Sequence, residues 1–106
     1  MKIHKLKDMI RGWLIGNFEP TVFKTKDVEV GVRHYLSGEY EKRHFHKVAT
    51  EITVIVSGEV VMNDRVFGPG DIVTILPNES TDFKAIRNTV NVVIKIPGEL
   101  NDKYEV

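Results

Sequence analysis

The chain has 106 residues, no cysteine, and 15 basic side chains that balance 15 acidic ones. This length suits one domain, residues 1–106, with one modest hydrophobic core. The zero net charge gives no reason to expect a nucleic-acid or membrane partner, and the lack of cysteine excludes disulfides and thiolate metal ligands.

Residues 1–27 are predicted to form an arm that precedes the main fold. Charged residues interrupt its apolar ones too often for a signal peptide, so we expect a cytoplasmic protein. Apolar residues recur there at three- to four-residue intervals, at Ile3, Leu6, Ile10 and Trp13. This spacing permits a short helix, which the glycine of RGW would end early.

The region from residue 28 to residue 96 is predicted to be all-β. Turn signals separate short runs that are rich in valine and isoleucine, among them EITVIV, EVVMN, DIVTIL and VNVVIKI. Several of these runs are apolar almost throughout, which is typical of strands that are covered on both faces. The sequence therefore predicts a sandwich or a closed barrel.

The run DVEVGVRHYL has two faces of different character, because alternate residues of a strand point to opposite sides. Val30, Val32 and His34 share the more apolar face, so His34 is expected to be a core or interface histidine. Arg33 and Tyr35 share the other face. Arg33 is then either a solvated surface charge or an anchor for a substrate carboxylate or phosphate inside the barrel. Tyr35 either packs or lines the same pocket, and the two residues are the candidates for substrate binding.

The stretch HFHKVATE carries the clearest chemical signal, with two of the chain's four histidines one residue apart. On a strand, His44 and His46 point the same way, so their imidazoles converge. After the short connection KVAT, Glu51 opens the next strand and can lean toward the same point. Two imidazoles and one carboxylate, with positions left open, suit one divalent metal ion. The ligand set alone does not choose among iron, manganese, zinc, nickel and copper.

This stretch resembles the first motif of the small cupins. The motif is matched by Gly38, five residues, His44, one residue, His46, four residues, Glu51, six residues and Gly58. The resemblance covers most of the chain, from about residue 28 to residue 96. It implies a double-stranded β-helix, or jelly-roll barrel, with a metal near its mouth, a small-molecule ligand inside and usually a dimer.

The family's second motif is matched only in part, by GDIVTILPNESTD. Gly70, Asp71 and Pro77 fit it. Glu79 stands where the family has a glycine, and Asp82 stands where the family has a third histidine. Asp82 is therefore a further metal ligand through oxygen, a substrate-facing base, or an outward surface residue.

Two classes of function follow from such a site. The first is a metal-dependent enzyme, oxygenase-like or isomerase-like, that acts on a small polar molecule such as a sugar derivative or a carboxylic acid. Glu51 would then be both a metal ligand and the catalytic residue. The second is a non-catalytic module that binds or senses a small molecule. A sensor would need an output, and no DNA-binding or partner domain is evident, which favours the enzyme.

The run ITVIV predicts a second covered surface. It holds apolar residues of both parities, with Ile52, Val54 and Val56 on one side and Ile55 on the other. One barrel interior can bury only one of these sides, so the other needs a partner. The sequence therefore predicts a homodimer.

Overall fold

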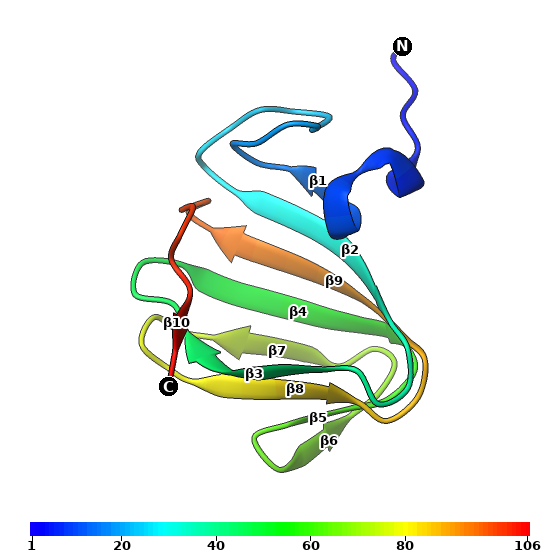
Figure 1. The fold of residues 1–106 in the computed structure, drawn as a ribbon, viewed down its shortest axis with the longest axis vertical. Helices are drawn as coiled ribbons and strands as arrows, with labels where there is room; N and C mark the ends of the chain where they lie inside the picture. The colour runs from blue at the N-terminus through cyan, green and yellow to red at the C-terminus, as the bar shows by residue number, and fades with distance from the viewer.

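The computed structural model describes all of residues 1–106 and confirms the all-β fold, with two five-stranded antiparallel sheets (Figure 1). The first sheet contains, in spatial order, β1 (Trp13–Ile15), β2 (Glu29–Tyr35), β9 (Thr89–Ile96), β4 (Thr50–Ser57) and β7 (Ile72–Ile75). The second contains β10 (Tyr104–Glu105), β3 (Tyr40–Phe45), β8 (Thr81–Ala85), β5 (Val60–Met62) and β6 (Arg65–Phe67). From β2 onward the chain passes back and forth between the sheets, apart from the β5–β6 hairpin. This is a jelly-roll arrangement.

The N-terminal arm forms two single-turn 3₁₀ helices, η1 (Leu6–Asp8) and η2 (Ile10–Gly12), instead of one continuous helix. Gly12 has a φ of +82°, a conformation that favours glycine. A Cβ at this position would lie 1.9 Å from the backbone oxygen of Val32, so only glycine lets the arm pass so close to β2. Neither helix has the length and apolar character needed to span a membrane.

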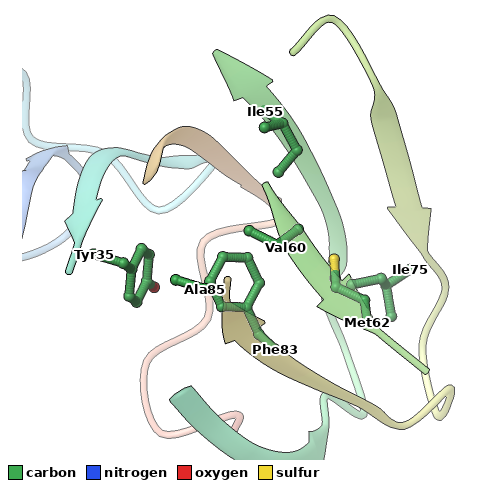
Figure 2. Close-up of a cluster of buried hydrophobic side chains, with 7 residues drawn as sticks. All are labelled: Tyr35, Ile55, Val60, Met62, Ile75, Phe83 and Ala85. Carbon is green, nitrogen blue, oxygen red and sulfur yellow. The ribbon is translucent and has the colours of Figure 1, made fainter. Parts of the chain in front are cut away.

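The hydrophobic core lies between the two sheets and takes side chains from both (Figure 2). Seven buried residues form it: Tyr35, Ile55 and Ile75 from the first sheet, and Val60, Met62, Phe83 and Ala85 from the second. The rings of Tyr35 and Phe83 pack with their centroids 4.7 Å apart. Tyr35, Met62 and Phe83 also line a cavity, so the core forms the floor of that cavity.

Strand β2 turns its more apolar face away from the core. His34 is exposed on the outer face, so of the two expected positions the core is wrong and the interface stays a prediction. Glu29, Gly31 and Tyr35 are buried on the opposite face. Arg33 belongs to that inner face and lines the cavity, which favours the interpretation of Arg33 as an anchor inside the barrel over that of a surface charge.

The outer face of the first sheet is apolar across β2, β9, β4 and β7. Alternate residues point away from the core there and are half-buried or exposed: Val30, Val32, Val92, Ile94, Ile52, Val54, Val56 and Ile72. Ile72 is 65% exposed and Val56 is 53% exposed. A contiguous apolar surface of this kind is typical of an interaction site.

Candidate metal centre

His44, His46 and Glu51 come together at one point between the sheets. His44 lies on β3, His46 directly follows that strand, and Glu51 is the second residue of β4. Their potential ligand atoms all lie within 4.8 Å of one another, and both histidines are buried. The two imidazole rings meet edge to face with centroids 5.4 Å apart. The structure thus shows the convergence expected from the His-x-His spacing, in a geometry that can hold a metal ion.

A hydrogen bond fixes the orientation of the His44 ring. Its Nδ1 donates to the backbone oxygen of Lys42 at 2.7 Å. Because a carbonyl oxygen only accepts, this bond places the proton on Nδ1 and leaves the lone pair of Nε2 free. Metal-binding histidines are commonly supported in this way by a bond from the ring nitrogen that does not bind the metal.

His46 has a buried ring nitrogen without a partner. Its Nε2 is inaccessible to solvent and makes no hydrogen bond. Burial, together with the positive charge of Lys95 and the neighbouring His44, lowers the pKa of His46 to about 4, so the ring is neutral at neutral pH. Buried polar atoms are rarely left unpaired, and a metal ion at Nε2 would satisfy this one. The residues at this point therefore fit a metal.

Glu51 belongs to a row of charged side chains on the inner face of the first sheet. Backbone pairing places Lys95 opposite Glu51 on one side and opposite Glu29 on the other. Burial raises the pKa of both carboxyl groups, and Lys95 opposes that rise. Glu29 is buried with its Oε2 unpaired. The alternation of DVEVGVR gave the face of Glu29 but not that this face turns inward, so the sequence did not single it out.

Asp102 anchors the connection that follows His46. Its carboxylate accepts hydrogen bonds from the backbone N–H groups of Lys47, Val48 and Ala49 at 2.9 to 3.2 Å. Burial alone would raise the pKa of Asp102, but these donors hold it below its usual range. No local pattern in the sequence relates this residue to a loop that lies 53 to 55 positions earlier.

The structure does not bring Asp82 to the cluster. Its carboxylate accepts hydrogen bonds from the Arg43 side chain at 3.3 Å and from the backbone N–H of Asn63 at 2.8 Å. Thr81 takes the inward position instead. It is buried, pairs with His44 across β3 and β8, and lines the cavity. The cluster therefore has three candidate ligands, and a threonine stands beside them.

A cavity of about 360 Å³ adjoins the cluster. His44 and Glu51 line it, so a molecule in the cavity would lie against two candidate metal ligands. Arg33 and Tyr35, the expected substrate-binding residues, line it too. Burial, with a smaller contribution from Glu41, raises the pKa of Tyr35, so its hydroxyl stays protonated and can donate a hydrogen bond. The volume lies within the usual range of small-molecule sites.

Solved structures resemble this fold, although no protein-family model and no curated protein matches the chain. A Klebsiella pneumoniae protein with a double-stranded β-helix domain has a TM-score of 0.69 at 21% identity, over 92% of this chain and 86% of that chain. An RmlC-like cupin from Shewanella frigidimarina has a TM-score of 0.68 at 15% identity, over 73% and 72%. The DMSP lyase DddQ from Ruegeria pomeroyi has a TM-score of 0.65 at 26% identity, over 84% of this chain and 46% of the lyase.

Proposed function

We propose that this chain, a small cupin domain by its fold, holds one divalent metal ion at His44, His46 and Glu51 and is a metal-dependent enzyme for a small polar molecule. Two observations carry the proposal: the Nε2 of His46 is buried and unpaired, and one potential ligand atom from each of the three residues lies within 4.8 Å of the others. Iron, manganese, zinc and nickel all suit a set of two imidazoles and one carboxylate.

The residues around the cluster have separable roles in this proposal. A bound ion would supply Lewis acidity toward an oxygen of the ligand or toward water. The carbonyl of Lys42 holds the His44 ring so that Nε2 is free to bind. Glu51 contributes the negative charge of the ligand set. Phe83 and Val93 give part of the cavity an apolar wall, which strengthens electrostatic effects beside it.

Two observations favour an enzyme over a binding or sensing module. A molecule in the cavity would lie against His44 and Glu51, as catalysis at a metal requires. The DMSP lyase to which this chain is similar is itself an enzyme, although the chain spans only 46% of it. Because one fold serves many reactions, oxygenase-like and isomerase-like chemistry are equally compatible with the site.

Metal content tests the proposal. We expect elemental analysis of freshly purified protein to give close to one divalent ion per chain. The His44→Ala/His46→Ala double variant should lose it and keep a β-rich circular dichroism spectrum. His34→Ala is the matched control, because His34 is exposed on the outer face, and it should bind metal as the wild type does.

Each outcome separates the remaining alternatives. Metal at the wild-type level in the double variant would contradict the proposed ligands. Iron in the wild type would support oxygenase-like chemistry, and zinc or nickel would leave isomerase-like chemistry and the binding module. A wild type that contains no metal and takes up neither manganese nor zinc on titration would leave only the binding module.

We further propose that the chain forms a homodimer through the outer face of the first sheet. The support is the apolar surface that β2, β9, β4 and β7 share, on which Ile72 and Val56 are more than half exposed. Hydrophobic burial is the main driving force of such association, and a second copy would offer the same face in return.

A further inference from the structure

Arg33 holds a positive charge inside the cavity without a carboxylate at salt-bridge distance. Its guanidinium carbon lies 5.6 Å from the centroid of the Trp13 ring and 5.4 Å from that of Tyr35. None of the four salt bridges of the chain includes it. The aromatic rings stabilise the cation but offer no acceptors to its N–H groups. A planar guanidinium binds a carboxylate through two parallel hydrogen bonds, so a carboxylate is the complement that Arg33 lacks.

The other cations that line the cavity have a carboxyl-bearing residue or solvent beside them. Lys103 forms an ion pair with Glu41 at 3.9 Å. Lys95 forms no salt bridge, and its Nζ lies 5.0 Å from the centroid of the Trp13 ring. It lies opposite Glu29 and Glu51 on the two neighbouring strands, and its charge opposes the rise that burial causes in the pKa of both carboxyl groups. Arg11 is exposed, and water satisfies its donors. Arg33 is therefore the cavity cation that a ligand would neutralise.

Asn91 adds a second unsatisfied group beside Arg33. The two residues are direct partners across β2 and β9, and both line the cavity. Asn91 is 2% exposed, and its Nδ2 donates to the hydroxyl of Thr53 at 3.0 Å. Its Oδ1 is buried and has no partner. An unpaired buried acceptor next to an unpaired cation calls for a ligand with a donor close to an anionic group.

Trp13 packs into this corner of the cavity, in space that a glycine leaves free. Trp13 on β1 pairs with Gly31 on β2, and its ring lies against that glycine. A Cβ at residue 31 would come within 2.8 Å of the ring, so the glycine leaves the space that the indole occupies next to Arg33. The indole thereby forms one wall of the corner in which Arg33 and Asn91 meet.

We propose that the cavity binds a small hydroxy-carboxylate. The Arg33 guanidinium, beside the rings of Trp13 and Tyr35, binds the carboxylate of the ligand. The Oδ1 of Asn91 accepts a hydrogen bond from the hydroxyl of the ligand. This ligand would occupy the site of the proposed function. Its position next to a metal rests on that proposal. The subsite itself consists of protein groups alone, so it can be tested without metal.

Trp13 is the only tryptophan of the chain and reports on this corner directly. Protein passed over a chelating resin is titrated with malate, with its neutral analogue malamide, and with succinate, which lacks the hydroxyl. We expect malate to change the fluorescence saturably, succinate to bind more weakly, and malamide to have no effect. Equal responses to malate and malamide, or no saturable response to malate, would overturn the carboxylate subsite. Equal affinity for malate and succinate would overturn the role of Asn91.

Variants of the cation complete the test. Arg33→Met should raise the Kd for malate by about tenfold or more, since a hydrogen-bonded charge pair is lost. Arg33→Lys, which keeps the charge, should lie between that variant and the wild type. Arg65→Met is the matched control, because Arg65 also lies over an aromatic ring, that of Phe67 at 5.5 Å, but does not line the cavity. It should bind malate as the wild type does.

Metal titration keeps the two proposals apart. Arg33→Met should take up manganese or zinc as the wild type does, because Arg33 is not a ligand. If the wild type binds malate but no metal, the subsite stands and the proposed metal centre fails. If malate binds Arg33→Met as tightly as wild type, the subsite fails whatever the metal result.

Discussion

Asp102→Ala should destabilise the protein by removing the anchor of the loop between His46 and Glu51. The carboxylate accepts four hydrogen bonds from three consecutive backbone N–H groups. Lys47 and Val48 are exposed, so water replaces the lost acceptor there. Ala49 is only 1% exposed, and its N–H would be left without a partner.

The expected loss follows from these environments. A buried N–H left unsatisfied costs about 1–3 kcal/mol, and the exposed bonds to the charged group add about 1 kcal/mol after water replaces them. We therefore expect Asp102→Ala to lower the free energy of unfolding by about 2–4 kcal/mol. Metal affinity should fall as well. The loop joins His46 to Glu51, and a loop that the substitution has disordered would have to become ordered again when the metal binds.

Urea denaturation followed by circular dichroism measures the effect. Asp71→Ala is a suitable control, because that exposed carboxylate accepts one backbone hydrogen bond, from Gly68 at 2.8 Å, within a turn. The control should lose about 1 kcal/mol or less. A loss of less than about 0.5 kcal/mol in Asp102→Ala, the range of ordinary surface changes, would refute the anchoring role.

The pH dependence gives the same prediction a second readout. The backbone donors hold the pKa of Asp102 below its ordinary value of 3.8 in the folded state. A carboxyl group with a depressed folded pKa contributes stability above its unfolded pKa and loses that contribution as the pH falls through the folded one. The gap between wild type and Asp102→Ala should therefore be constant near neutral pH and narrow below about pH 4. A gap that widens with acidity would contradict the assigned hydrogen bonds.

Two further predictions concern β8 and the outer sheet. Thr81→His should raise zinc affinity in calorimetric titration, because residue 81 lies opposite His44 and faces the cavity, whereas Asp82→His should leave metal binding unchanged. A stronger effect of Asp82→His than of Thr81→His would contradict the observed orientation of β8. Light scattering at micromolar concentration should give twice the 12.1 kDa chain mass. Ile72→Glu should shift that mass toward the monomer. Val66→Glu, at a position of β6 that is 59% exposed against 65% for Ile72, should not. A monomeric wild type would refute the dimer.

The parts of the site that the sequence predicts are those set by local geometry. The His-x-His spacing places two imidazoles on one side of a strand whatever the rest of the fold does. Glu51 follows after a connection too short to carry it far from His46. The structure brings these three side chains together, and the cupin-type jelly roll expected from the same motif is confirmed.

The orientation of β2 was harder to predict because the usual rule points the wrong way. An apolar strand face normally turns to the core or to an interface, and these are the two positions expected for His34. Here the inner face lines a polar cavity and carries Glu29 and Arg33, while the apolar face belongs to the outer surface of the sheet. The alternation gave the two faces correctly, but only the tertiary structure decides which of them is inside. Asp102 is beyond local reasoning altogether, since its partners lie more than 50 residues away.

For β8, the hydrophobic pattern in the sequence is sufficient to predict which way Asp82 points. In TDFKAI, Asp82 shares one face with Lys84, and the opposite face carries Phe83 and Ala85. Phe83 and Ala85 are core residues, so their burial fixes the phase of the strand and turns Asp82 outward to Arg43. A shift of one residue would expose Phe83 and bury a lysine, and both changes destabilise the fold. The hydrophobic pattern therefore outweighs the alignment to the second motif, and Thr81, opposite His44, is the one polar residue of this strand on the inward face.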